Sequence, residues 1–155
     1  MNEKYLIPKP PYNIKRIWSK ICMVVSRQSL VMPSFRRRML KLGGVKINGK
    51  CFIGSNVQFD GMFPNLIEIG SGCVITTGTC ILSHFYNTSD RRFYAGKVVI
   101  GKNVFIGMNT LIVNAVNIGD GAIIGAGSIV NRDIPAGEIW GGNPARFIKK
   151  LNYEE

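Results

Sequence analysis

Residues 100–130 read IGKNVFIGMNTLIVNAVNIGDGAIIGAGSIV, and an isoleucine or valine returns at every sixth position of this stretch. The series runs Ile100, Ile106, Ile112, Ile118, Ile124 and Val130, and four of these six residues are followed at once by glycine. A short fixed period with a glycine corner is typical of a β-helix, in which each hexad supplies one short strand and its turn. The stretch therefore predicts an all-β coil.

The same spacing extends toward the N-terminus with two interruptions. Ile47 and Ile53 form one frame, and Ile69, Ile75 and Ile81 form a second. The breaks between frames predict a short insertion around residues 60–67 and a longer one around residues 83–98. Loops that leave a rigid scaffold are frequent positions for binding and catalytic groups, so the longer insertion is the first candidate for function.

Side chains alternate along a strand, and this alternation predicts which residues line the coil. The residues two positions before the repeat residues should point inward with them: Val104, Thr110, Val116, Ala122 and Ser128. The residues immediately before should point outward: Val99, Phe105, Leu111, Asn117, Ile123 and Ile129. With three hexads per turn, Phe105 stacks on Ile123 and Leu111 on Ile129. Exposed apolar strips of this kind usually mark an interface, so we expect a homo-oligomer in the form of a three-fold ring.

All of the excess positive charge lies in the first third of the chain. Residues 1–50 contain twelve Lys or Arg and one acid, whereas residues 51–155 contain eight of each. Apolar residues at helical spacing predict an amphipathic helix here, and Pro33 ends the pattern, with Ser34 as the expected N-cap of a second short helix over residues 36–42. These apolar residues are Ile14, Ile17, Trp18, Ile21, Val24 and Val25.

Two uses of this helix remain open. Its apolar face can pack on the end of the coil and close an edge that would otherwise aggregate, which is the favoured interpretation. Alternatively, it can lie on an anionic membrane surface. Nucleic acid is not an expected partner, because no recognition motif accompanies the charge.

The chain divides into three segments on these grounds. Residues 1–42 form a basic helical segment, residues 43–142 form the β-helix with an active-site loop at 83–98, and residues 143–155 form a C-terminal helix and tail. We expect neither a signal peptide nor a membrane span, since no leader pattern and no run of about 18 apolar residues occurs. This predicts a cytoplasmic protein, with the inner membrane face as the site of any peripheral association. The four cysteines lack CxxC spacing and are expected to be buried thiols.

Residues 98–150 carry motifs that resemble one known family. The runs IGAGSIV at 124–130, DIP at 133–135 and GGNPAR at 141–146 are similar to the C-terminal half of the hexapeptide-repeat acyltransferases. The resemblance covers about residues 43–150 and implies a left-handed coil, a homotrimer and acetyl-CoA as co-substrate. The basic N-terminal segment, followed by SFRRRMLKLGGVKI, resembles those members of the family that acetylate sugar hydroxyls in surface-polysaccharide synthesis. An acetyltransferase of a small molecule such as an antibiotic, or a non-catalytic β-helix binding protein, are the alternatives.

His84 is the only histidine, and it lies where the coil gives way to the longer insertion. An alcohol attacks a thioester slowly at neutral pH without a base, and histidine is the side chain best suited to that role. The resemblance places the catalytic histidine at the same point, so we expect His84 to be the general base. The group that orients it stays open among Asp90, Glu68 and a carbonyl. A carbonic-anhydrase-type zinc site needs three histidines, so we expect no metal.

The resemblance also implies which residues hold the two substrates. It points to the main chain at Met108 and the small residue Ala126 beside the pantetheine, and to basic or polar groups near the nucleotide: Asn131, Arg132, Arg146 and Lys149. The long insertion should hold the sugar or glycan acceptor through aromatic and polar side chains, namely Tyr86, Asn87 and Asp90. Trp140 either packs on the C-terminal helix or lines the coenzyme groove.

Overall fold

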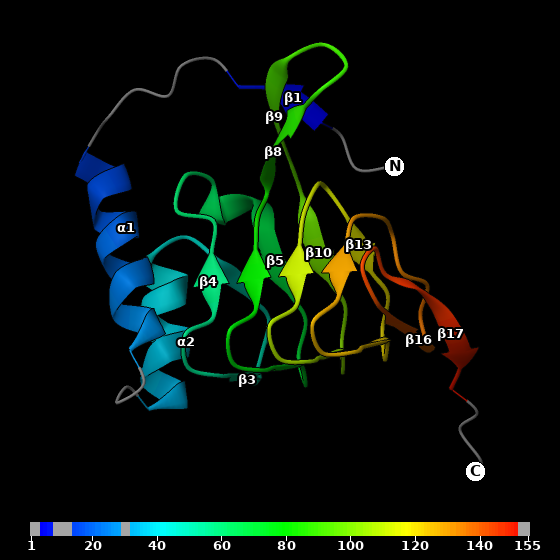
Figure 1. Ribbon diagram of the computed structural model, residues 1–155. Coiled ribbons are helices and arrows are strands. Elements are labelled where there is room, and N and C mark those ends of the chain that lie inside the picture. Colours follow the sequence, from blue (N-terminus) through cyan, green and yellow to red (C-terminus); the bar gives the residue numbers. More distant parts are fainter. Residues whose placement is uncertain (1–3, 8–13, 29–31, 152–155) are drawn as a thin grey trace.

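The computed structural model describes residues 4–7, 14–28 and 32–151. Expectations for the remaining positions, including Lys9 and the tail at 152–155, lie outside the described residues. The chain winds into a row of stacked coils that begins at two helices and ends at a pair of longer strands (Figure 1). The predicted β-helix is therefore confirmed.

Each coil contributes one short strand to each of three parallel sheets, which we call faces 1, 2 and 3. Face 1 contains β2 (Lys46–Ile47), β5 (Ile67–Ile69), β10 (Val98–Ile100) and β13 (Asn117–Ile118). Face 2 contains β3 (Phe52–Ile53), β6 (Val74–Ile75), β11 (Phe105–Ile106), β14 (Ile123–Ile124) and β16 (Glu138–Gly141). Face 3 contains β4 (Gln58–Phe59), β7 (Cys80–Ile81), β12 (Leu111–Ile112) and β15 (Ile129–Val130).

The strand register confirms the side-chain directions predicted from the repeat. Phe105 pairs with Ile123 and Leu111 with Ile129, so the outer residues stack as expected. The repeat isoleucines fill the core, and the smaller inward residues two positions earlier are buried beside them. Each isoleucine removed from water contributes about 1.5–3 kcal/mol, so a column of them is the main source of stability.

The coil corners have a backbone requirement that explains their composition. At the edge between faces 2 and 3, equivalent positions in successive coils are Asn56, Gly78, Asn109 and Gly127, all with φ between 54° and 78°. Glycine adopts this left-handed conformation without a Cβ clash, and asparagine tolerates it better than other residues. The alternation of Asn and Gly at the corners therefore follows from the turn geometry.

Two helices close the first coil, and the inner one makes the hydrophobic contact. Helix α2 (Pro33–Leu42) places Leu40 in the core, and helix α1 (Ile14–Arg27) adds Met23. The prediction that Ser34 is the N-cap is wrong: α2 begins at Pro33, with Met32 at the cap position and no side-chain cap bond. Proline suits the first helical position, because its missing N–H would have no partner there.

Helix α1 is oriented differently from the favoured expectation. Its buried residues are Cys22, Met23 and Ser26, and Ser19 donates a 2.5 Å hydrogen bond to the carbonyl of Gly43. Five of the six apolar residues predicted to pack on the coil are instead 48–85% exposed, namely Ile14, Ile17, Trp18, Ile21 and Val24, whereas Val25 is half-buried. The expectation that this stripe caps the coil is therefore wrong.

A buried arginine fastens the two helices to the coil. Arg36 on α2 is 3% exposed and donates to the carbonyls of Ser26 (2.7 Å), Gln28 (2.9 Å) and Ile53 (2.7 Å). The first two carbonyls lie at the C-terminal end of α1, where helical carbonyls lack intrahelical partners and favour a cation. Burial lowers the pKa of the guanidinium from its usual value.

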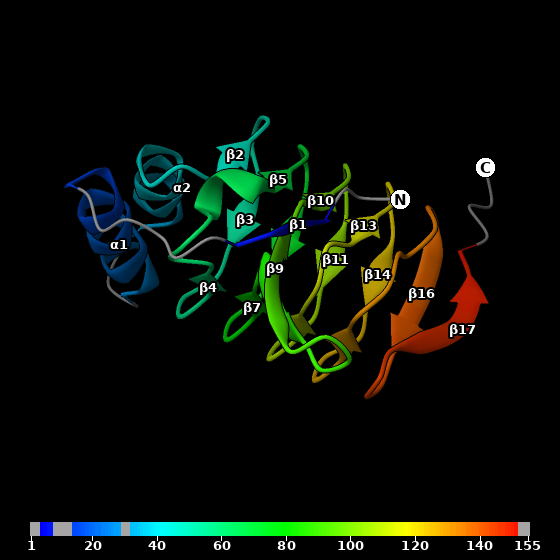
Figure 2. The same cartoon turned by 90° about the horizontal axis from the view of Figure 1, so that it is seen from above.

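Both insertions leave the coil at the edge between faces 3 and 1, which we call edge 3/1. The shorter one contains a 3₁₀ turn, η1 (Pro64–Leu66). The longer one is a hairpin of β8 (His84–Asn87) and β9 (Arg92–Gly96). The N-terminal strand β1 (Lys4–Leu6) adds to β9, which the sequence did not predict. This three-stranded sheet projects from one side of the coil (Figure 1), and the view from above looks down onto it (Figure 2).

The expected C-terminal helix is wrong for the residues that the structure describes. Residues 146–150 form strand β17 (Arg146–Lys150), which turns back and pairs antiparallel with β16. Trp140 on β16 meets Phe147 of β17 edge-on at 6.4 Å, so it packs on the C-terminal segment as one alternative proposed, with a strand in place of a helix. The pair extends face 2 beyond the last coil.

Two further expectations concern membrane spans and thiols. In the part of the chain that the structure describes, no helix is long and apolar enough to cross a bilayer. Cys22, Cys51 and Cys73 are buried free thiols, whereas Cys80 is half-buried. Burial, with a contribution from nearby Cys73, raises the pKa of the Cys51 thiol to about 11, which leaves little reactive thiolate at neutral pH.

Candidate active site

The candidate site is built where two successive coils reach edge 3/1. Phe59 of β4 and Ile81 of β7 are register partners on face 3, so the residues that follow them are neighbours in space. Asp60 follows the first and Ser83–His84 the second. The two insertions thus begin side by side, although they are more than twenty residues apart in the sequence.

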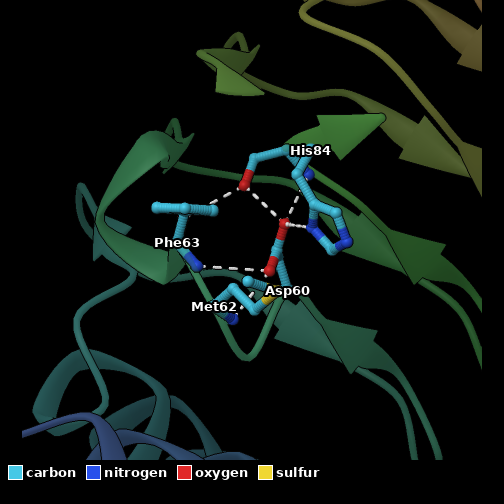
Figure 3. A network of polar contacts seen from close by, with 5 residues as sticks. Asp60, Met62, Phe63 and His84 are labelled. Atoms are coloured by element: carbon cyan, nitrogen blue, oxygen red, sulfur yellow. Dashed lines mark hydrogen bonds and ion pairs between the residues drawn. The ribbon is translucent and has the colours of Figure 1, made fainter. Parts of the chain in front are cut away.

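Asp60 is the centre of this site, with a side chain that is 0% exposed. Its Oδ2 accepts hydrogen bonds from the Ser83 N–H (3.0 Å) and Ser83 hydroxyl (2.7 Å), and lies 2.6 Å from Nδ1 of His84. Its Oδ1 accepts from the backbone N–H groups of Met62 (2.8 Å) and Phe63 (3.2 Å). Figure 3 shows the carboxylate enclosed by these donors. Five contacts hold one buried anion in place.

The charge state of Asp60 follows from these contacts. Burial alone raises the pKa of the carboxyl, but the hydrogen bonds from His84, Ser83 and Met62 outweigh it and lower the pKa below its usual value. Asp60 is therefore ionised at neutral pH and accepts the proton on Nδ1 of His84. Whenever the imidazole is neutral, this contact places its proton on Nδ1 and leaves Nε2 as the basic nitrogen, which is the tautomer a general base needs.

His84 is half-buried, and its outer nitrogen points away from Asp60 (Figure 3). Its side chain is 26% exposed, so part of the ring is in contact with solvent. Phe63 borders the ring edge-on at 6.3 Å, and the guanidinium of Arg16 on α1 lies 5.5 Å from the Phe63 ring centre. The imidazole is thus fixed on one side by Asp60 and bordered on another by an aromatic wall.

The residues expected to hold the acceptor lie on the hairpin that starts at His84. Asn87 Oδ1 accepts from the Ser89 N–H, and Asp90 accepts from the Arg92 N–H and the Tyr94 hydroxyl. These bonds shape the hairpin turn. Tyr86 is 48% exposed and stacks at an angle on Phe93, with ring centres 5.0 Å apart.

The residues expected to hold coenzyme A are spread over different parts of the coil. Asn131 and Arg132 are exposed and follow β15, so they lie on edge 3/1 like His84, two coils further along. Met108 and Ala126 are exposed on the edge between faces 2 and 3, which we call edge 2/3. Arg146 and Lys149 are exposed on β17. One protomer therefore brings together only some of these residues, and the width of face 3 separates His84 from Met108 and Ala126.

The surface of edge 2/3 fits a long flexible substrate. A Cβ added to Gly127 would meet no atom within 4 Å, so this corner is open, and Ala126 beside it carries only a methyl group. The exposed cations Arg132, Arg146 and Lys149 match the phosphate groups of coenzyme A in charge. Among the described residues, no group of three or more His, Cys, Asp or Glu could hold a metal ion.

Asp60 is a candidate site residue that the sequence interpretation missed. The candidates for orienting His84 were Asp90, Glu68 and a carbonyl, and the structure excludes both carboxylates from that role. Asp90 accepts a hydrogen bond from the Tyr94 hydroxyl within the hairpin, and Glu68 forms an ion pair with Lys97 at 2.9 Å. The signal was available in the repeat, because aligning Phe59 with Ile81 places Asp60 next to the start of the long insertion.

Comparisons with known proteins agree with this architecture. Residues 97–132 match the family model described as bacterial transferase hexapeptide (six repeats). The Bacillus subtilis (strain 168) protein named "Putative acetyltransferase YvoF" is 42% identical over 104 residues, which cover 67% of this chain and 59% of YvoF. The chain spans little more than half the length of several curated relatives that it matches.

Solved structures show the same fold. A galactoside acetyltransferase in complex with coenzyme A matches with a TM-score of 0.70 and 25% identity, over 89% of this chain and 81% of that one. A hexapeptide-repeat acetyltransferase from Vibrio cholerae in complex with acetyl coenzyme A matches with a TM-score of 0.69 and 25% identity, over 89% and 87%. The resemblance seen in the sequence is confirmed, and the coil is the left-handed β-helix of these proteins.

Proposed function

We propose that this chain, whose β-helix has the fold of the solved hexapeptide-repeat acetyltransferases, transfers an acetyl group from acetyl-CoA to a hydroxyl of a sugar in surface-polysaccharide synthesis. The observation that carries the proposal is the Asp60–His84 pair at the start of the hairpin. A buried carboxylate that holds a neutral imidazole, with its second nitrogen open to a substrate, is an arrangement suited to deprotonating an alcohol.

The reaction follows from the position of the protons. The acceptor hydroxyl donates to Nε2 of His84, which takes the proton as the hydroxyl oxygen forms a bond to the acetyl carbonyl carbon. The carbon–sulfur bond breaks, and the leaving thiolate receives the proton from Nε2. Asp60 stabilises the imidazolium between these two transfers, and base catalysis of this type contributes about 10²–10⁴ in rate. Backbone N–H groups near Met108 are the proposed donors to the carbonyl oxygen.

A trimer completes the site in this proposal. If face 3 points toward a three-fold axis, edge 3/1 of one protomer lies beside edge 2/3 of the next, as in any closed heterologous ring. His84, Asn131 and Arg132 of one copy then face Met108 and Ala126 of its neighbour across a groove. Outward apolar residues of face 3 support such packing, since Leu111 and Ile129 stack on each other and are only half-buried in a single copy.

Within that groove the exposed cations bind the phosphates of coenzyme A. Arg132 on edge 3/1, and Arg146 and Lys149 on β17, are the proposed phosphate ligands, with Asn131 as a polar contact. Their separation along the coil axis suits an extended molecule whose thioester end reaches His84. The small surface at Ala126 and Gly127 leaves room for the pantetheine arm.

The hairpin supplies the acceptor site. The exposed aromatic face of Tyr86 suits a sugar ring, and Asn87 and Asp90 lie at the far end of the same hairpin. Because both polar side chains already accept turn hydrogen bonds, they act through their remaining lone pairs or by shaping the turn.

The test is acetyl transfer by wild type and by the His84→Asn variant on a panel of acceptors. The panel includes glycans, simple sugars and an antibiotic, and coenzyme A release and product mass are measured. We expect transfer to a glycan or sugar, with kcat about 10²–10⁴ lower in the variant and acetyl-CoA binding by calorimetry unchanged. Wild-type turnover by the variant would refute the role of His84. Binding of acetyl-CoA with no transfer to any sugar would refute the proposed acceptor class.

A further inference from the structure

Helix α1 presents most of its large apolar side chains to solvent and a mixed side, with two serines, to the protein. Residues at positions i, i+3, i+4, i+7 and i+10 form the exposed stripe Ile14, Ile17, Trp18, Ile21 and Val24. The opposite side, which contacts α2 and the coil, carries Ser19, Cys22, Met23 and Ser26. An amphipathic helix on a globular protein normally has the reverse orientation, so this stripe requires a partner.

The charges beside the stripe indicate which partner fits. Neither α1 nor α2 contains an acidic residue, and Arg16, Lys20 and Arg27 recur at helical spacing along one border of the stripe. A second copy meeting at this face would bring two strongly basic segments together, which costs free energy. An anionic lipid surface matches both features, since its acyl chains accept the apolar side chains and its headgroups attract the cations. We propose that α1 docks this protein on an anionic membrane surface.

The position of α1 in the fold agrees with this assignment. The helix lies at the outer end of the row of coils, beyond α2 (Figure 1). In a ring built from the side faces of the coils, all three copies of α1 lie at the same end of the assembly. Three weak attachments to one surface reinforce each other, so a helix of 14 residues is sufficient.

Docking in this orientation also brings the membrane next to the candidate active site. Ile14 and Trp18 of the stripe line a cavity of about 660 Å³ that Met62 and Phe63 also line. Phe63 borders the ring of His84 at 6.3 Å. This second step rests on the proposed function: it assigns the acceptor to the class of sugars carried on a lipid, which reach His84 from the membrane side.

The docking step is tested by co-sedimentation of the full chain with phosphatidylcholine vesicles, with and without phosphatidylglycerol. We expect binding to the anionic vesicles that weakens as salt is raised, because the headgroup attraction is screened. The double variant Ile17→Gln/Ile21→Gln should lower the partition coefficient into anionic vesicles at least about tenfold, because two apolar side chains that would be buried among the acyl chains are replaced by polar ones. Both residues are exposed, so the substitutions leave the fold unchanged, and circular dichroism confirms this.

Two control variants test whether vesicle binding is specific to the stripe on α1 and independent of catalysis. Ile148→Gln removes an equally exposed isoleucine from β17 and should bind vesicles as wild type does. His84→Asn should also bind vesicles fully, whatever its activity. Absence of binding to anionic vesicles would overturn the proposal, as would equal binding by the double variant. Assemblies larger than a trimer in wild type that dissociate in the double variant would overturn it in favour of a second copy.

The acceptor class is tested with the same double variant. We expect unchanged transfer to a soluble sugar and a loss of about tenfold or more in kcat/KM for the same sugar on a lipid carrier in vesicles. Equal loss on both acceptors would contradict the lipid-linked class while leaving membrane docking intact. Failure of wild type to acetylate either acceptor would count against the proposed function and not against docking.

Discussion

Replacing Asp60 by asparagine tests how the candidate site works, because the side chain keeps its size and loses only its charge and one acceptor. The carboxylate accepts five contacts, three at Oδ2 from Ser83 and His84 and two at Oδ1 from Met62 and Phe63. An amide has one oxygen. If it takes the Oδ1 position, its NH₂ group faces the donors on Ser83 and His84; if it takes the Oδ2 position, the NH₂ faces two backbone N–H groups.

The first orientation forces the imidazole to accept at Nδ1, which protonates Nε2 and removes the base. Either orientation leaves a buried donor without an acceptor, at a cost of about 1–3 kcal/mol for each such group. We therefore expect Asp60→Asn to lower kcat by about 10²–10⁴, with KM for acetyl-CoA unchanged, and to lower the free energy of unfolding by about 2–4 kcal/mol.

The assay is coenzyme A release at a temperature where urea titration shows the variant fully folded. Asp120→Asn is the matched control, because Asp120 accepts a backbone hydrogen bond from Lys102 through one oxygen, at a corner away from edges 2/3 and 3/1. A folded Asp60→Asn variant with wild-type kcat would refute the view that this carboxylate sets the tautomer of His84.

Three further predictions concern stability. Arg36→Met removes the donor to two buried carbonyls and one part-buried carbonyl and should cost about 2–5 kcal/mol in urea unfolding, whereas the exposed Arg38→Met should cost under about 0.5 kcal/mol; equal losses would contradict the fastening role. Gly107→Ala should lower the free energy of unfolding by about 2–4 kcal/mol, because its Cβ would lie 2.4 Å from a backbone nitrogen of the next coil. At the equivalent corner, the Cβ of Gly125→Ala would meet nothing closer than 3.6 Å, so the free energy of unfolding of that variant should stay within about 1 kcal/mol of wild type. The pKa of Asp60 is lowered on folding, so its contribution to stability is complete above the unfolded value of about 3.9 and is lost as pH falls through the folded value. The difference in unfolding free energy between wild type and Asp60→Asn should then shrink below about pH 4, and a difference that grows there would show the opposite shift.

The coil could be predicted in detail because its geometry repeats in the sequence. A period of six residues determines strand positions, inward and outward directions and the stacking of Phe105 on Ile123, all of which the register confirms. Elements outside the repeat lack such a signal. Residues 146–150 have no period, and their basic residues after a proline were compatible with a helix, whereas pairing with β16 makes them a strand.

The site was predictable only in part for the same reason. His84 is the only histidine and sits at a break in the repeat, so residue type and position together identified it. Its partner Asp60 depends on a contact between two coils, and the choice requires the register of Phe59 with Ile81. The exposed stripe of α1 illustrates another limit, because helical spacing predicts an apolar side without stating what it faces.

In the proposed trimer, His84 of one protomer acts on a thioester held against edge 2/3 of its neighbour. Mixing two inactive variants tests this shared site: His84→Ala, which keeps edge 2/3, and Ala126→Trp, which blocks it. Each alone should form trimers without activity. Trimers reassembled from equal amounts contain some sites with an intact His84 and an intact neighbouring edge, so we predict recovery of about one quarter of wild-type activity, the statistical share of such sites in a three-fold ring. Recovery no greater than either variant alone would contradict a site shared between protomers.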